Sequence, residues 1–284
     1  MDFLQPRTWA DALAAKAERP DALPVAGGTD VMVELNFDRV RPTALLDLTG
    51  VEELCEWGME GARVRLGAGV TYSRVITELG TLLPALAMAS RTVGSPQIRN
   101  RGTVGGNLGS ASPAGDAHPP LLAGDAVVEV ESTRGSRVMP LAEFFTGVKR
   151  TALEPDELIK AVLVPPGGGP QEFAKIGTRN AMVIAVTSFA VALHPDGRRV
   201  GTGIGSAAPT PRRAPAAEDF AAETLDWDGR TDLPDEVARR FGELVAAAAV
   251  PIDDVRGTAA YRLHSLTVLA RRTLSWAWSN YQRA

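Results

Sequence analysis

Two short stretches of the sequence place a pair of glycines before a side chain that can form hydrogen bonds. AGGTD at residues 26–30 carries Thr29 after its pair, and TVGGN at residues 103–107 carries Asn107. Converging backbone N–H groups can bind the acceptor oxygens of a diphosphate without lysines, provided that glycine lets the backbone come close. Each stretch alone is typical of an ordinary turn. Together in one predicted domain they indicate an anionic ligand.

Neither stretch matches the two common nucleotide-binding motifs. The pattern G-x-G-x-x-G after a strand, with an acidic residue about 20 positions later, is absent, and so is G-x-x-x-x-G-K-[ST]. A Rossmann fingerprint and a P-loop are therefore excluded. A nucleotide bound by this chain would be held in another way.

The remaining reactive side chains are few and scattered. His118, His194 and His264 are far apart in the sequence, which is typical of surface or core histidines and not of a metal site. His118 follows the second glycine stretch, near enough to approach a ligand there, and we assign it no catalytic role. Cys55 has no neighbouring acid–histidine pair, so we interpret it as a buried structural thiol. No Ser-His-Asp spacing predicts a nucleophile.

Composition limits the class of protein. The chain has 284 residues, 45% of them hydrophobic and 23% charged, enough for one large domain or two ordinary ones. A net charge of −4 gives no broad basic field, which argues against nucleic-acid or anionic-membrane partners. No basic run precedes an apolar core near the first residues, and no apolar run approaches the ~20 residues of a membrane span. We expect a cytoplasmic protein.

The single cysteine also limits the redox chemistry. Cys55 can form no internal disulfide, and one thiol cannot by itself hold an iron–sulfur cluster or a structural zinc. An electron carrier bound by this chain must therefore be organic. Any iron–sulfur carrier would be bound by another chain.

The elements that must position the glycine stretches follow from periodicity. A capping box from Thr8 to Asp11 predicts a helix over residues 8–19, ended by Pro20. Residues 23–35 predict a strand, a glycine turn and a short helix or strand. Strands are predicted at 43–50, 63–71, 126–132 and 157–165, a helical pattern at 72–89, and a long irregular stretch at 92–120. A loop of that length between anchored strands is typical of a functional segment.

A second unit is predicted after the break PPGGGP at residues 165–170. Beyond it, strands are predicted at 172–179, 183–193 and 199–208, the last two joined by a hairpin turn HPDGR. Helices are predicted at about 234–250 and 258–281, and we interpret the apolar stripe of the second as core packing. This pattern indicates a small α+β domain.

Three segments resemble a known family. They are VAGGTDVMVEL (25–35), TVGSPQIRNRGTVGGNLGSASPAGDAHPPLLAGDAVVEV (92–130) and AAPTPRRA (207–214), and they are similar to the FAD-binding medium subunit of the molybdenum hydroxylases. This is the family of xanthine dehydrogenase and carbon monoxide dehydrogenase. With weaker similarity elsewhere, the resemblance covers nearly the whole chain in the family's order. It implies an α+β fold: an FAD-binding domain of the vanillyl-alcohol oxidase (PCMH) type in two subdomains, residues 1–168, and a small C-terminal α+β domain of the CO dehydrogenase flavoprotein type, residues 169–284.

The resemblance also assigns cofactor-binding residues. It implies a first FAD loop with backbone amides facing the diphosphate, and a second loop opposite it. Asp116 would close the second loop and accept hydrogen bonds, and Lys175 would be a basic contact of the flavin. The family has a polar or acidic residue shortly after the segment RNAM (179–182), where this chain has Val183, which puts contacts beyond Arg179 in doubt. The residues that the resemblance assigns to FAD are Ala26, Gly27, Gly28, Thr29, Asp30, Thr103, Gly105, Gly106, Asn107, Ser110, Ser112, Asp116, Ile159 and Lys175.

The implied function is electron transfer within an oxidoreductase complex. A large molybdopterin-binding subunit would oxidise the substrate, a small subunit with [2Fe-2S] clusters would carry the electrons, and FAD on this chain would pass them to NAD, oxygen or a quinone. Two alternatives stay open: a stand-alone flavin-dependent oxidase or dehydrogenase of the same fold, and a flavin-free scaffold subunit. The substrate lies outside this chain, so a purine, an aldehyde, carbon monoxide and an N-heterocycle are all compatible with the sequence, with a purine favoured by general similarity.

Overall fold

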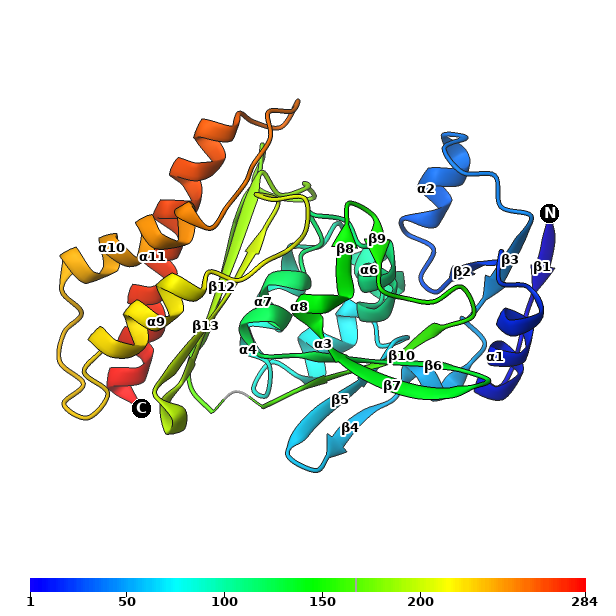
Figure 1. Ribbon diagram of the computed structural model, residues 1–284, viewed down its shortest axis with the longest axis horizontal. Coiled ribbons are helices and arrows are strands. Elements are labelled where there is room, and N and C mark those ends of the chain that lie inside the picture. Colours follow the sequence, from blue (N-terminus) through cyan, green and yellow to red (C-terminus); the bar gives the residue numbers. More distant parts are fainter. Residues whose placement is uncertain (167) are drawn as a thin grey trace.

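The computed structural model describes residues 1–166 and 168–284, and Figure 1 shows its helices and sheets in sequence colours. The first segment forms a three-stranded parallel sheet in the order β1-β3-β2, from β1 (Asp2–Leu4), β3 (Ala44–Asp47) and β2 (Leu23–Val25). Helix α1 (Trp9–Glu18) connects β1 to β2, and the predicted cap is confirmed, since Thr8 Oγ1 accepts from the Asp11 N–H at 3.1 Å. A short helix, α2 (Val31–Asn36), follows the first glycine loop.

The middle of the chain builds a five-stranded antiparallel sheet. Its order is β4-β5-β10-β6-β7, from β4 (Trp57–Glu60), β5 (Arg63–Gly67), β10 (Leu158–Val164), β6 (Val127–Ser132) and β7 (Gly135–Pro140). In β6, Val128 and Val130 are fully buried and alternate with partly buried residues, as expected of a strand with one face on the core. The predicted strands at 63–71, 126–132 and 157–165 are confirmed.

The long stretch at 92–120, expected to be irregular, contains helices. They are α5 (Pro96–Arg101), α6 (Val104–Ser110) and α7 (His118–Ala123). Each is too short for an apolar period to show, and the start signals are a proline at the first turn of α5 and caps at Ser95 and Thr103. The expectation of one irregular segment is therefore wrong.

The helical pattern at 72–89 is divided into α3 (Tyr72–Glu78) and α4 (Pro84–Thr92). The division has a local cause: Leu83 precedes a proline, a position that disfavours helical backbone, and its φ and ψ are −133° and 64°. A 3-10 turn at Glu52–Cys55 and the elements α8 (Leu141–Phe144), β8 (Phe145–Gly147) and β9 (Arg150–Thr151) complete this part.

The C-terminal part has the three predicted strands in one antiparallel sheet. They are β11 (Gln171–Ile176), β12 (Thr187–His194) and β13 (Arg199–Gly205), with the expected hairpin between the last two at Pro195–Gly197. The predicted helices are α10 (Asp235–Ala247) and α11 (Ala259–Arg283), while α9 (Pro215–Thr224) was not expected. Of the predicted PPGGGP connection, Gly167 lies outside the described residues.

The C-terminal sheet lies between two groups of helices (Figure 1). α9, α10 and α11 pack on one side, around a core that includes Phe189, Phe241 and Trp278. α4 and α7 pack on the other, where a smaller cluster joins Ala89 and Phe173. This second contact packs α4 and α7 against the sheet that carries β11.

Candidate functional site

The first glycine loop leaves its backbone donors free. Between β2 and α2, the N–H groups of residues 26–31 have no protein acceptor among the described residues, although the carbonyls of Gly28 and Asp30 accept from the first turns of α2. Gly28 has φ +74°, a conformation that favours glycine. Consecutive free N–H groups at a turn are the usual backbone site for an anion.

Gly27 in this loop allows a close approach of two backbone segments. A Cβ at Gly27 would lie 1.9 Å from the carbonyl oxygen of Arg101 and 2.9 Å from Cα of Gly102. No side chain fits there, so the requirement for glycine comes from packing against the residues that precede the second loop.

The second loop is different because its backbone donors are already used. Thr103 caps α6, with its Oγ1 accepting from the Gly106 N–H at 2.9 Å. The N–H of Val104 donates to the carbonyl of Val70, and that of Gly105 to the carbonyl of Ala68, each at 3.0 Å. The loop is therefore held to residues 68–70, and its contribution to a ligand comes from side chains and close approach.

Two side-chain oxygens near this loop are buried without a partner. Asn107 Oδ1 and Asp116 Oδ1 each lack a hydrogen bond within the described residues. Such atoms are costly unless something donates to them, so they indicate a ligand with donor groups. The geometry thus adds two acceptors to the free donors of the first loop.

Asp116 is joined to the C-terminal sheet. Its Oδ2 accepts from Lys175 Nζ at 2.6 Å, and both side chains are about nine-tenths buried, with exposures of 10% and 6%. Burial raises the pKa of Asp116 to about 6, against the opposing effect of the Lys175 ammonium. Lys175 Nζ also donates to the carbonyl of Thr92 at 3.2 Å.

The other expected residues lie around α6. Ser110 Oγ donates to Asp30 Oδ2 at 2.8 Å and so joins the two loops. Ser112 Oγ accepts from the Ala114 N–H at 3.3 Å, which shapes the following turn. Ile159 of β10 is buried beneath the helix, since a Cβ at Gly109 would lie 3.7 Å from its Cδ1.

The His118 side chain contacts the second loop and the turn that follows it. It is fully buried, and its Nε2 lies 3.2 Å from the carbonyl oxygen of Asn107. A Cβ at Gly115 would lie 2.2 Å from the imidazole, so the turn rests on the ring. Burial lowers the pKa of His118 to about 4, which keeps the ring neutral at physiological pH.

The segment around Val183 forms hydrogen bonds and contacts within its own loop. The Arg179 guanidinium donates to the carbonyls of Ala181 and Met182, both at 3.1 Å, within its own loop. Val183 packs against Gly177.

Cys55 is partly buried, and burial raises the pKa of its thiol, as expected of an unreactive cysteine. The described residues contain no cluster that could hold a metal ion.

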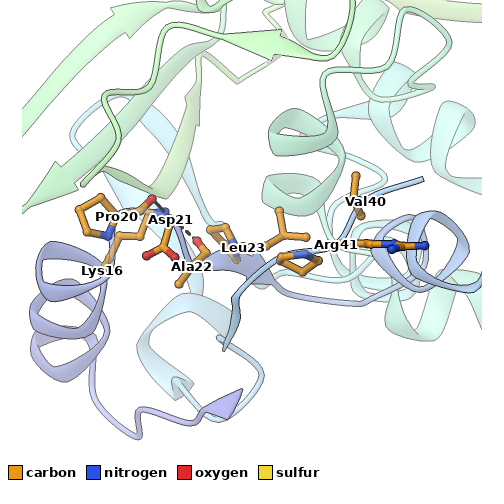
Figure 2. Close-up of a pocket in the computed structure, with 9 residues that line it drawn as sticks. Lys16, Pro20, Asp21, Ala22, Leu23, Val40 and Arg41 are labelled. Atoms are coloured by element: carbon orange, nitrogen blue, oxygen red, sulfur yellow. Dashed lines mark hydrogen bonds between the residues drawn. The ribbon is translucent and has the colours of Figure 1, made fainter. Parts of the chain in front are cut away.

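A hollow of about 500 Å³ lies beside β2 (Figure 2). It is lined in part by Lys16, Pro24 and Arg41, and none of the residues assigned to FAD lines it. Lys16 Nζ donates to the carbonyls of Pro20 and Ala22 at 2.8 and 2.7 Å, so backbone carbonyls hold its ammonium group. We therefore place the candidate site at the two glycine loops.

Sequence reasoning missed Tyr72, the first residue of α3. Its side chain is 2% exposed and its hydroxyl has no hydrogen-bond partner within the described residues. A tyrosine that begins a predicted helix carries no signal of a site, because only the tertiary fold shows that the hydroxyl is buried.

The residues present fit FAD, the cofactor expected from the sequence. The free N–H groups of residues 26–31 suit a diphosphate, and the unpartnered Asn107 and Asp116 oxygens suit donors on sugar or flavin groups. The Ser110–Asp30 hydrogen bond and the Asp116–Lys175 ion pair hold these parts together.

Comparison with known proteins shows the family of the chain. Residues 1–167 match the family described as FAD binding domain in molybdopterin dehydrogenase, and residues 172–277 match the CO dehydrogenase flavoprotein C-terminal domain. No helix within residues 1–166 or 168–284 is long and apolar enough to cross a membrane.

Individual relatives match over nearly their full length. A xanthine dehydrogenase FAD-binding subunit of Escherichia coli O157:H7 is 31% identical, covering 95% of this chain and 93% of the relative. The nicotine 6-hydroxylase medium subunit of Paenarthrobacter nicotinovorans is 31% identical, covering 96% and 95%. A chain of reconstituted CO dehydrogenase from Oligotropha carboxidovorans superposes with a TM-score of 0.90 at 29% identity, covering 99% and 98%. The chain therefore belongs to the family of FAD-binding domains in molybdopterin dehydrogenases.

Proposed function

We propose that this chain is the FAD-binding electron-transfer subunit of a molybdenum hydroxylase complex. The observation that carries the proposal is the run of free N–H groups at residues 26–31, which a hydrogen bond between Asp30 and Ser110 joins to α6. Neither a Rossmann fold nor a P-loop is needed to bind the dinucleotide in this way.

The chain's own residues bind and orient the cofactor. The amides of the first loop take the diphosphate, with Thr29 and Ser110 beside them. Asn107 and Asp116 accept from the sugar and flavin groups, and Ile159 forms the apolar floor. Lys175 holds Asp116 in place and puts a positive charge near the flavin. When bound, FAD supplies a group that takes up and releases electrons, and this transfer requires no general acid or base.

The partners follow from the same assignment. A large molybdopterin-binding subunit would carry out the oxidation, and a small subunit with [2Fe-2S] clusters would deliver the electrons. The external acceptor, which is NAD, oxygen or a quinone, and a cytoplasmic location stay predictions from the sequence. We also propose a domain division at residues 168 and 169, supported by separate cores on either side of the connection.

An FAD titration tests the cofactor assignment. The purified chain should be yellow, or become yellow after incubation with excess FAD and removal of the free cofactor. A chain that stays colourless would contradict the proposal and favour a flavin-free scaffold.

The role in electron transfer needs a second measurement. Anaerobic incubation of the FAD-loaded chain with small alcohols should leave the flavin oxidised, because in the proposed complex the substrate is oxidised on the large partner subunit. Bleaching without a partner would instead indicate a stand-alone flavin enzyme. Purification from its own cells should bring down a roughly threefold larger chain and a cysteine-rich small one.

A further inference from the structure

Tyr72 is a buried side chain that the proposed function has not used. It is 2% exposed, and its hydroxyl has no hydrogen-bond partner within the described residues. A buried hydroxyl without a partner costs free energy, so a hydroxyl kept at such a place indicates a group that bonds to it in another state of the protein.

The backbone places Tyr72 beside both glycine loops. The Tyr72 N–H donates to the carbonyl of Gly102 at 3.0 Å, and Thr71 forms a β-bridge with Thr103. The N-terminal caps of α3 and α6 therefore lie side by side, at a junction of the two segments. A Cβ at Gly102 would lie 3.3 Å from the Tyr72 ring. Gly27 of the first loop packs on the same Gly102. The ring therefore lies behind the junction of the two loops.

The charges around the hydroxyl keep it protonated. Burial raises the pKa of Tyr72 well above its usual value, and the carboxyl groups of Asp116 and Asp30 raise it further. Of these two groups, Asp30 is bonded to Ser110 and Asp116 to Lys175. The phenol thus keeps its proton and remains a hydrogen-bond donor.

We propose that Tyr72 is a further FAD-binding residue, whose hydroxyl donates a hydrogen bond to the flavin–ribityl half of the dinucleotide. The inference rests on the proposed function. The free amides of the first loop already serve the diphosphate, and they lie next to Asp30. This leaves the flavin half, which brings ring and ribityl acceptor atoms, for a phenol donor behind the junction of the two loops.

The variant Tyr72→Phe tests this, because it removes one oxygen and keeps the ring. Deflavinated full-length chain is titrated by calorimetry with FAD, with FMN and with ADP. We expect Kd to rise roughly 5- to 30-fold for FAD and for FMN, as for loss of one hydrogen bond, and to stay unchanged for ADP. The matched control is Tyr261→Phe at the start of α11, where the tyrosine residue is 49% exposed; this variant should bind all three ligands like wild type.

The thermal midpoint of the cofactor-free variant gives an independent measurement. If the hydroxyl serves only a ligand, its removal relieves an unsatisfied buried group, so the midpoint should stay the same or rise. A fall would mean that the hydroxyl bonds within the protein, and would overturn the inference.

The binding results separate the two proposals. Unchanged FAD affinity in Tyr72→Phe would show that the hydroxyl contacts only buried water, and overturns this inference while the proposed function stands. An equal loss for ADP would overturn the assignment to the flavin half. A wild-type chain that binds no FAD would overturn both.

Discussion

At the scale of residues, Asp116 and His118 are two positions apart, and burial shifts their pKa values in opposite directions. Burial raises the pKa of Asp116 from 3.8 to about 6 and lowers that of His118 from 6.5 to about 4. Both groups are therefore neutral near pH 5. The Asp116 carboxyl becomes charged as the pH rises through about 6, beside the Lys175 ammonium.

The stability of the cofactor-free protein should reflect these shifts. Between pH 3.8 and 6, folded Asp116 keeps a proton that the unfolded chain has lost, so its contribution to the unfolding free energy falls as the pH rises. Folded His118 lacks a proton that the unfolded chain holds between pH 4 and 6.5, so its contribution rises over nearly the same range. The two contributions offset each other in the wild type.

Asp116→Asn should remove the first contribution and leave the second. We expect the unfolding free energy of the variant to rise with pH, relative to wild type, by ~3 kcal/mol between pH 4 and 6.5, at ~1.4 kcal/mol per pH unit of pKa difference. Urea denaturation across this range measures it. The change of unfolding free energy with pH is the quantity to compare, because the substitution also leaves Lys175 unpaired. A pH dependence equal to that of wild type would contradict the raised pKa of Asp116.

Gly27 gives a prediction about binding. Gly27→Ala places a methyl group 1.9 Å from the Arg101 carbonyl, so the first loop must move away from its packed position. We expect FAD affinity to fall ~100-fold, equivalent to ~3 kcal/mol, measured by quenching of flavin fluorescence. Gly58→Ala is the control, since no atom lies within 4 Å of its added Cβ. Equal affinities in the two variants would exclude the close approach as a requirement.

At this scale the sequence indicated candidate residues but not their contacts. The resemblance assigned Asp116 and Lys175, and the structure brings them together in one ion pair. It could not distinguish the two glycine stretches, which look alike in sequence, because whether an N–H is free depends on partners such as Ala68 and Val70. Tyr72 was missed for the same reason.

At the scale of elements, strong local signals were sufficient and weak ones were not. The Thr8 cap and the alternation in β6 predicted α1 and that strand. The short helices α5, α6 and α7 were missed because glycine and proline conceal a helical pattern when the helix has only six or seven residues. Caps and tertiary packing form them instead.

α2 is the least supported helix next to the site. None of its residues is buried, and side-chain bonds join it to the rest of the unit: Glu34 contacts Lys149, and Asp30 at its start accepts from Ser110 at 2.8 Å. Exposed ion pairs contribute ~0–1 kcal/mol each. The helix should therefore open locally at little cost.

The double variant Ser110→Ala, Lys149→Ala tests this. We expect protease cleavage within residues 31–40 of the cofactor-free chain to become roughly 5- to 30-fold faster, as for a local opening made easier by ~1–2 kcal/mol, with global stability nearly unchanged. Arg134→Ala breaks an ion pair with Asp156 that does not involve α2, and it serves as control. Unchanged cleavage would mean that other contacts hold the helix.

At the scale of the whole molecule, the site includes residues on both sides of the chain's central connection. Lys175 comes from β11 of the C-terminal sheet, and Asp116 from the turn before α7. The packing of α4 and α7 on that sheet keeps the two charges together. The sequence predicted the two units but could not predict this contact, because it depends on how their surfaces fit.

Lys175→Met should make stability depend on pH in a new range. Without the ammonium, the folded-state pKa of Asp116 rises further, and the carboxyl keeps its proton at pH 5 at little cost. As the pH rises to 8, ionising it in a buried place without a partner should cost ~3 kcal/mol of unfolding free energy relative to wild type. Denaturation of the cofactor-free protein at both pH values measures the difference; an equal cost at pH 5 and 8 would show that the pair is not buried in solution.

The free amides at residues 26–31 have one more consequence. Backbone hydrogens without an acceptor exchange with solvent deuterium quickly, whereas hydrogens bonded to a ligand are protected. The first loop should therefore exchange fast in the cofactor-free chain and slowly in the loaded one, while the already bonded amides at 104–107 change little. Deuterium uptake of one short peptide would then report how many molecules in a sample carry the cofactor.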